Sequence, residues 1–175
     1  TRQAGRKRGQ AGQAMNRPPL PDAPYTGGCL CGAVRYSYNA RPLALNACHC
    51  SDCKKLSGSS YFAVVQSKGE AFNFTGETTH HRKTADSGRG VDIHRCAACG
   101  TRLWHTPAGS SELVFFAAGT LDDPSWFVPT SHIWAASAQP DVMFAPDALI
   151  IEGAPTDRQP IWDRFFWIAP LVLVG

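Results

Sequence analysis

Seven cysteines constrain this 175-residue chain more than any other feature, because all of them fall into three tight clusters. The clusters read Cys29-x-Cys31, Cys48-x-Cys50-x-x-Cys53 and Cys96-x-x-Cys99. Seven thiols cannot all pair within one chain. No apolar stretch follows the basic start, so we expect no secretory signal and a cytoplasmic, reducing setting in which structural disulfides are rare. The cysteines are therefore interpreted as metal ligands or reactive thiols.

The spacing within the clusters suits metal coordination. In an extended chain, residues i and i+2 project from the same face, so the two thiols of a C-x-C motif can point at one ion. The stretch Cys96-Ala97-Ala98-Cys99-Gly100 is typical of a turn that wraps two thiolates around a metal, with the glycine supplying a positive φ. Clusters made of thiolates alone favour zinc.

The number of thiols predicts two different zinc sites, since zinc usually takes four ligands and seven is four plus three. A closed structural site is expected from the two pairs, Cys29/Cys31 and Cys96/Cys99. The remaining triplet leaves one coordination position open, which is typical of a catalytic or ligand-exchanging zinc; its members are Cys48, Cys50 and Cys53. An ion there would hold an incoming thiol as thiolate. We thus expect two zinc ions per chain.

Three alternatives remain open from the residues alone. His49 could join the triplet, although in an extended Cys48-His49-Cys50 it points to the opposite face. A distant histidine could close the triplet instead, with candidates His94, His105 and His132. Finally, Cys96 and Cys99 could form a redox-active pair, which would leave Cys29 and Cys31 unexplained.

Short runs of β-branched and aromatic residues, separated by turn-forming residues, predict a mostly β fold built from short antiparallel strands. The hydrophobic fraction of 43% suffices for one core, and 16 glycines and 13 prolines indicate many turns. One or two helical turns are expected after Ser51, and another over Leu121–Trp126. The candidate strands are 33–38, 60–65, 71–74, 91–95, 112–118, 132–135 and 148–151.

Charge and composition divide the chain into three parts. Residues 1–24 hold five basic residues and one acid, or +4, so the rest of the +3 chain carries −1. We interpret 1–24 as a disordered basic tail, 25–152 as the zinc domain and 153–175 as a C-terminal extension. A nearly neutral body argues against nucleic-acid binding, which only the Arg6-Lys7-Arg8 run would support.

The extension contains an apolar stretch, Ile161 to Val174. Its apolar run from Phe165 is too short to span a bilayer, which needs ~20 residues, and no membrane partner is expected. The stretch is expected to pack on the body or on a partner, so a homo-oligomer could form through it.

The cysteine motifs, with their flanking residues, resemble those of the glutathione-dependent formaldehyde-activating enzyme family, which includes the centromere protein V domain. The opening motif is Gly27-Gly28-Cys29-Leu30-Cys31-Gly32, and the second is Cys48-His49-Cys50-Ser51-Asp52-Cys53. The third is Cys96-Ala97-Ala98-Cys99-Gly100-Thr101. Similar stretches occur at Gly119–Pro124 and His132–Trp134, so the resemblance covers roughly 25–147.

The resemblance implies a β-tent fold of small antiparallel sheets, a structural zinc on the four cysteines and a catalytic zinc on the three. It also implies a carbon–sulfur lyase-type activity, in which glutathione adds to formaldehyde to give S-hydroxymethylglutathione. The expected partners are therefore a small-molecule thiol, with glutathione as co-substrate, and an aldehyde. The alternative is a non-catalytic zinc-stabilised β module that binds a thiol, a peptide or a protein.

Several polar residues outside the cysteine clusters are weaker candidates. Lys54 and Lys55 could offset the negative charge of a thiolate site, or be ordinary solvated lysines. Asp122, Asp123 and His132 could assist catalysis, but a turn at the aspartates and a buried strand histidine fit the sequence better. Arg35 and Tyr36 are interpreted as strand surface and core.

Overall fold

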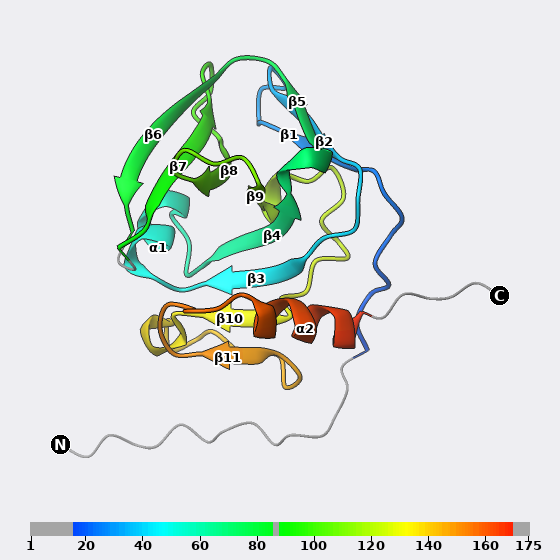
Figure 1. The fold of residues 1–175 in the computed structure, drawn as a ribbon, viewed down its shortest axis with the longest axis vertical. Coiled ribbons are helices and arrows are strands. Elements are labelled where there is room, and N and C mark those ends of the chain that lie inside the picture. The colour runs from blue at the N-terminus through cyan, green and yellow to red at the C-terminus, as the bar shows by residue number, and fades with distance from the viewer. Residues whose placement is uncertain (1–15, 86–87, 170–175) are drawn as a thin grey trace.

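Two β-sheets form the body of the computed structural model, which describes residues 16–85 and 88–169 (Figure 1). The smaller sheet has the strand order β1-β2-β5. Its strands are β1 (Tyr25–Gly28), β2 (Arg35–Tyr38) and β5 (Phe72–Thr75). The larger sheet has the order β11-β10-β3-β4-β9-β8-β7-β6. Its strands are β3 (Ala44–Cys48), β4 (Phe62–Lys68), β6 (Thr78–Thr84), β7 (Gly90–Cys96), β8 (Arg102–Pro107), β9 (Leu113–Ala117), β10 (Ser131–Ile133) and β11 (Leu149–Ile151).

The strands enclose the core like the sides of a tent. In Figure 1, β3 and β4 form the base, the β6–β7 hairpin rises on one side, and the smaller sheet closes the other. The described residues also form two α-helices, α1 (Ser51–Ser57) and α2 (Gln159–Ile168), and three short 3-10 helices, Gly69–Ala71, Ala118–Thr120 and Ala135–Ser137. The expected mostly β class is therefore confirmed.

The pairing departs from a purely antiparallel arrangement at one edge. β3 pairs antiparallel with β4, but β10 pairs parallel with both β3 and β11. The long connection from β9 to β10 and the second connection to β11 allow this, because parallel neighbours need crossovers rather than tight turns. The larger sheet, with eight strands, is also wider than the small sheets expected from the sequence.

All seven candidate strands exist, with ends shifted by a few residues, and the helix after Ser51 is confirmed. The helix expected over Leu121–Trp126 is wrong, because Asp122 and Asp123 lead into Pro124 and the segment forms turns. β1, β3, β6 and β8 were not predicted. β6 illustrates the reason: its sequence TTHHRKT is polar and mostly exposed at the sheet edge, so it has no apolar alternation.

Aromatic side chains pack the two sheets together. Tyr36 and Phe72 belong to the smaller sheet, and their rings lie 5.5 and 5.8 Å from the ring of Phe116 on β9. Tyr36 and Phe116 are almost fully buried. Such ring pairs add to the free energy of burying the apolar surface, so this cluster fixes how the two sheets meet.

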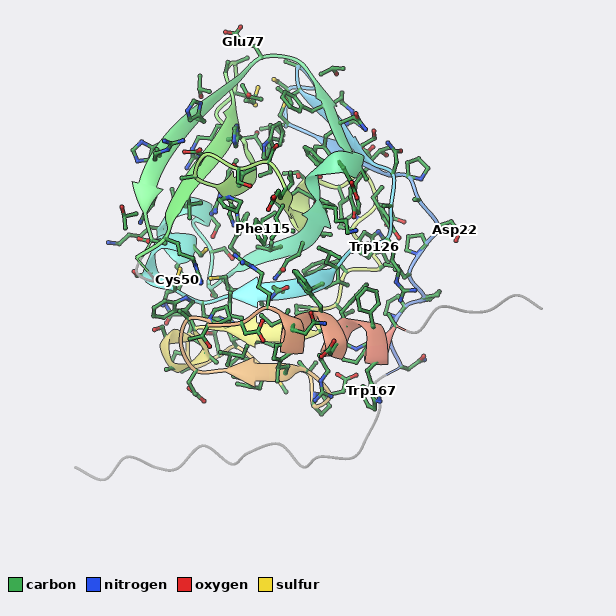
Figure 2. All side chains as sticks on the ribbon, viewed as in Figure 1. Asp22, Cys50, Glu77, Phe115, Trp126 and Trp167 are labelled. Carbon is green, nitrogen blue, oxygen red and sulfur yellow. The ribbon has the colours of Figure 1, made fainter. Side chains whose placement is uncertain are left out.

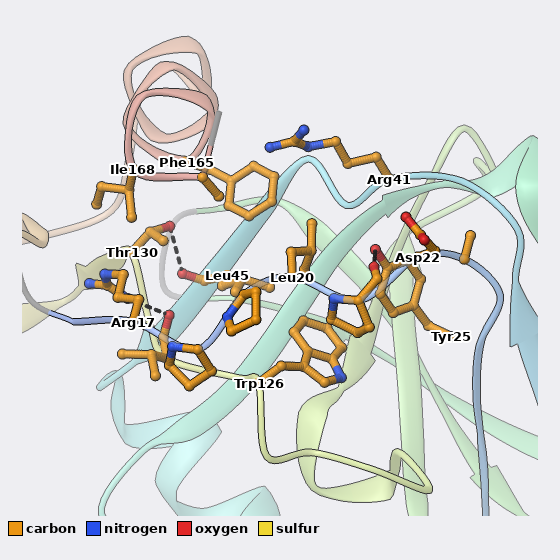
Figure 3. Close-up of a pocket in the computed structure, with 16 residues that line it drawn as sticks. Arg17, Leu20, Asp22, Tyr25, Arg41, Leu45, Trp126, Thr130, Phe165 and Ile168 are labelled. Atoms are coloured by element: carbon orange, nitrogen blue, oxygen red, sulfur yellow. Dashed lines mark hydrogen bonds between the residues drawn. The ribbon is translucent and has the colours of Figure 1, made fainter. Parts of the chain in front are cut away.

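Arg17 anchors the segment before β1 to the body (Figure 3). Its guanidinium donates to both carboxylate oxygens of Asp147, over 2.9 and 2.7 Å, and to the carbonyls of Val128 and Pro129. Arg17 and Asp147 are both largely buried. Arg17 therefore departs from the interpretation of 1–24 as a disordered basic tail, whereas the Arg6-Lys7-Arg8 run lies outside the described residues.

The C-terminal segment folds onto the body as α2. Ile161 and Phe165, one turn apart, are fully buried, and the helix packs over β3 and β10 (Figure 1). Trp167 is 67% exposed and lies on the side of α2 that faces away from the sheets (Figure 2). Packing of this apolar segment on the body is thus confirmed up to residue 169, and association of chains through it stays a prediction. Within 16–85 and 88–169, no helix has the length and apolar character needed to cross a membrane.

Two glycines with positive φ follow segments that carry cysteines, the helix α1 and the turn after β7. Gly58 follows α1 at φ 63°, and its N–H donates to the carbonyl of Lys54 over 2.9 Å. Gly100 follows the last cysteine motif at φ 72°, and its N–H donates to the carbonyl of Cys96 over 3.0 Å. Residues other than glycine rarely adopt these left-handed conformations.

We expect Phe165→Ala to lower the free energy of unfolding by about 3–5 kcal/mol, the usual cost of emptying a buried aromatic site. Trp167→Ala is the matched control on the same helix. Because Trp167 is mostly exposed and contacts Arg164 through its ring, its loss should cost less than about 1 kcal/mol. Urea unfolding of both variants checks this, and equal losses would contradict the burial of α2.

We also expect Gly58→Ala and Gly100→Ala each to lower the free energy of unfolding by about 1–2 kcal/mol, the cost of a left-handed conformation. A Cβ at either position meets no atom within 4 Å, so the backbone angle alone is responsible. Gly119→Ala is the control, because its Cβ also has free space but its φ is not left-handed. It should be neutral or stabilise by up to about 1 kcal/mol in the same unfolding experiment.

Candidate metal centres and the adjoining cavity

The first candidate metal centre gathers four thiols from two distant segments. Cys29 and Cys31 follow β1, while Cys96 ends β7 and Cys99 lies in the turn before β8. The Sγ atoms of Cys29 and Cys31 are 3.5 Å apart, and those of Cys31 and Cys96 are 3.8 Å apart. All four sulfur atoms lie within 4.8 Å of one another. The four cysteines that the sequence grouped are thus brought together.

The second centre gathers the three remaining thiols around the start of α1. Cys48 ends β3, Cys50 caps the helix, and Cys53 lies in its first turn. The sulfurs of Cys48 and Cys50 are 3.6 Å apart, and the Cys53 N–H donates to the sulfur of Cys50 over 3.4 Å. The three sulfurs lie within 4.8 Å of one another. In the described residues, no histidine or carboxylate joins this triplet.

The sulfur spacing matches a tetrahedral metal site. With Zn–S bonds of about 2.3 Å, the edge of a tetrahedron of sulfurs is about 3.8 Å long. The observed separations of 3.5, 3.6 and 3.8 Å lie close to that edge. Both clusters could therefore hold zinc, the first with a complete set of four thiols and the second with three.

The thiols of each cluster shift one another's acidity. The Cys48 thiol donates to the sulfur of Cys50, which lowers the pKa of Cys50 to about 2 and raises the pKa of Cys48. In the first cluster, the hydroxyl of Thr101 lies 3.1 Å from the Cys99 sulfur and lowers the pKa of Cys99 to about 5. Each cluster therefore holds negative charge at sulfur, as metal ligation requires.

A cavity of about 170 Å³ opens against the triplet, and most of the charged side chains in its largely apolar wall are basic. The β6–β7 hairpin, β8, β9 and the start of α2 all contribute to it. Figure 2 shows Cys50 beside α1, close to the lower end of that hairpin. The charged residues that line the cavity are Asp52, Lys83, Arg89, Arg102 and Arg158.

Arg102 lies deepest among these basic groups. It is only 9% exposed, and its guanidinium carbon is 3.7 Å from the centre of the Phe62 ring. Its Nε and Nη1 atoms are buried without a hydrogen-bond partner among the described residues. Burial lowers the pKa of Arg102, while the negative charge of Cys53 acts in the opposite direction. A buried cation with unused donors thus lies next to the triplet.

The histidines proposed as a fourth ligand have other partners. His49 is fully buried, and its Nε2 lies 3.0 Å from Nδ1 of His132. His94 stacks on Trp104 and His105 on Phe115. Burial lowers the pKa of His105 to about 3 and that of His132 to about 4, so both rings are neutral near pH 7. Among the described residues no histidine nitrogen joins the sulfur cluster, so the alternative of a histidine-closed triplet has no support from the geometry.

Unlike His105, which lines the triplet's cavity, the remaining candidates lie apart from it. The Lys54 ammonium donates to the carbonyl of Ser137 over 2.8 Å, and neither Lys54 nor Lys55 lines the cavity. Asp122 pairs with Arg35 and accepts from Thr26, so it lies beside β1 and β2 of the smaller sheet and does not line the cavity. Asp123 accepts from the N–H of Ser125, as a turn-forming aspartate does.

The surface and core interpretation of Arg35 and Tyr36 is confirmed, since Arg35 is exposed and Tyr36 is 3% exposed. The basic residues of the cavity were missed by the sequence interpretation. They come from segments far apart in the chain, and no local motif connects them. The only available signal was Arg102 directly after the C-x-x-C-G-T motif.

Comparison with known proteins gives three findings. The family model described as "Glutathione-dependent formaldehyde-activating enzyme" matches residues 24–137. No curated protein matches the chain. A crystal structure of a Rhodobacter sphaeroides protein is similar with a TM-score of 0.44 at 17% identity, covering 55% of this chain and 87% of that one. The family match includes all three cysteine motifs and most of the chain, so this chain belongs to the glutathione-dependent formaldehyde-activating enzyme family.

Proposed function

We propose that this protein is a zinc-dependent carbon–sulfur lyase-type enzyme that adds a thiol, with glutathione as the first candidate, to formaldehyde or a similarly small aldehyde. The observation that carries the proposal is the contrast between the two clusters. Four thiols complete one cluster, whereas three thiols face a cavity at the other. A zinc site with three protein ligands and one free position is the arrangement of catalytic zinc.

The donor set and spacing of the triplet support zinc as its ion. Thiolates prefer zinc among the common divalent ions, and the Cys48–Cys50 separation of 3.6 Å fits a tetrahedral edge. Cys48, Cys50 and Cys53 would hold this ion, and Cys29, Cys31, Cys96 and Cys99 would hold a structural one. When bound at the triplet, zinc stabilises the thiolate form of a thiol substrate or polarises the aldehyde oxygen.

The chain's own residues prepare the triplet's cavity for negatively charged sulfur. Three thiolates with one Zn²⁺ carry a net charge of −1, and an incoming thiolate makes this more negative. Arg102 offsets that charge from its position beside Cys53. Because Arg102 is buried, its attraction is less screened than that of a surface lysine.

The reaction balances without an oxidant or a reductant. The sulfur forms a bond to the carbonyl carbon, the C=O π electrons move to oxygen, and that oxygen takes a proton equivalent to the one the thiol lost. Neutral His105 and the Phe115 ring wall the cavity and limit access of water. The family description, which names glutathione and formaldehyde, supports these substrates.

Metal analysis tests the assignment of the two sites. We expect about two zinc ions per wild-type chain and about one in Cys53→Ser, with the fold retained, because only the structural site couples to folding. Cys96→Ser is the matched control. This variant should lose the zinc ion of the four-thiol cluster, and with it the near-UV circular dichroism signal of the folded protein. Two zinc ions in Cys53→Ser, or loss of its fold, would contradict the assignment.

Consumption of formaldehyde tests the activity. With glutathione present and the uncatalysed reaction subtracted, we expect Cys53→Ser to lower the catalysed rate by roughly 100-fold or more, since even residues that only orient metal ligands cost 10–100-fold. Lys54→Gln is the control, because Lys54 lies outside the cavity, and it should retain the wild-type rate.

Equal rates for the wild type and Cys53→Ser would overturn the enzymatic proposal. Binding of the thiol without any consumption of formaldehyde would instead support the non-catalytic thiol-binding module.

A further inference from the structure

Two arginines of the triplet's cavity, Arg89 and Arg158, form no ion pair with an acid among the described residues. Arg89 follows the β6–β7 turn, and Arg158 directly precedes α2. Asp52 is the one acid among the described residues that line the cavity, and it pairs with Lys83. In the described part of the chain, the Arg158 guanidinium has no ion pair, and its ring contact is with Phe115 at 5.4 Å.

The two arginines act on each other through their charges. Burial lowers the pKa of Arg158, and the positive charge of Arg89 lowers it further. Like charges held together in a half-buried wall destabilise the protein unless an anion lies between or beside them. Arg89 is exposed and partly screened by solvent, so the half-buried Arg158 is the more informative of the two.

The charge of the metal centre does not account for both arginines. Arg102, beside Cys53, already offsets the −1 of a three-thiolate zinc. The wall therefore carries more positive charge than the thiolates need. An anionic group on the substrate would use that excess.

The C-terminal segment forms part of this wall. Arg89 donates to the carbonyl of Pro155 over 3.3 and 3.4 Å. The Trp162 indole N–H on α2 donates to Oε1 of Gln66 over 3.0 Å, and Gln66 also lines the cavity. Pro155, Arg158 and Trp162, the residues through which this segment contributes to the wall, all lie after residue 137 and thus outside the part of the chain that matches the family.

We propose that Arg158, together with Arg89, binds a carboxylate of the thiol substrate, and that the C-terminal segment is therefore part of the substrate site. This inference rests on the proposed function and names its substrate class, a thiol that carries a carboxylate. Arginine suits this role because its planar guanidinium can bind both oxygens of a carboxylate.

The cavity's size limits how much of the substrate it encloses. A volume of about 170 Å³ is smaller than the ~300–1,000 Å³ of pockets that enclose drug-sized ligands. It accommodates a thiol and a nearby carboxylate, while the remainder of a tripeptide would extend into solvent. A small mercapto acid is consequently a sufficient probe.

The test compares a mercapto acid with its neutral amide. Binding of 3-mercaptopropionate and 3-mercaptopropionamide to the zinc-loaded full chain is measured by calorimetry, for the wild type, Arg158→Gln and Arg158→Lys. Arg164→Gln is the matched control, because it removes the same charge from the same segment, but Arg164 stacks on Trp167 and does not line the cavity.

We expect the wild type to bind the acid about tenfold more tightly than the amide, the effect of one hydrogen-bonded charge pair. Arg158→Gln should bring the ratio close to one without changing the affinity for the amide. Arg158→Lys should keep most of the preference, and Arg164→Gln all of it.

Equal affinities of the wild type for the acid and the amide would overturn the inference and leave thiol binding, hence the proposed function, standing. The same holds if Arg158→Gln keeps the preference. If neither thiol binds the zinc-loaded protein, the proposed function fails, and this inference fails with it.

Discussion

The four-thiol cluster is the constraint on which the rest of the structure depends. Cys29 and Cys31 leave the end of the three-stranded sheet, and Cys96 and Cys99 leave β7 of the eight-stranded sheet. A short three-stranded sheet has little independent stability. A metal ion held by thiols some 65 residues apart would offset the entropy lost in closing that long loop. With such an ion bound, the cluster and the Tyr36–Phe116 aromatic contact would together fix how one sheet closes on the other.

Features set by local chemistry could be predicted from the sequence. The i, i+2 and C-x-x-C spacings, together with the four-ligand preference of zinc, grouped the seven cysteines as the structure does, and turn chemistry correctly explained Asp123. The helix α2 could not be predicted in this way, because Pro160 and a sequence apolar on several sides conceal its helical period. Arg17 was missed for a similar reason, since its partner Asp147 lies 130 residues away.

The charges of the molecule likewise gather differently in the sequence and in the folded structure. Counted along the chain, the body is nearly neutral, which argues against nucleic-acid binding. In space, however, Arg89, Arg102 and Arg158 converge on one small cavity. Lys54 and Lys55, which follow the triplet in sequence, point elsewhere. Sequence proximity to a metal ligand was therefore a poor guide to which cations act on it.

The C-terminal segment links the stability of the fold to the shape of the cavity. Phe165 and Ile161 fix α2 in the core, and the same helix places Arg158 directly before its first turn and Trp162 against Gln66. The backbone of Arg158 is held by hydrogen bonds, since its carbonyl accepts from the N–H groups of Ile161 and Trp162. Its guanidinium has no ion pair among residues 16–85 and 88–169, and a preorganised cation of this kind binds an anion with little further loss of conformational entropy.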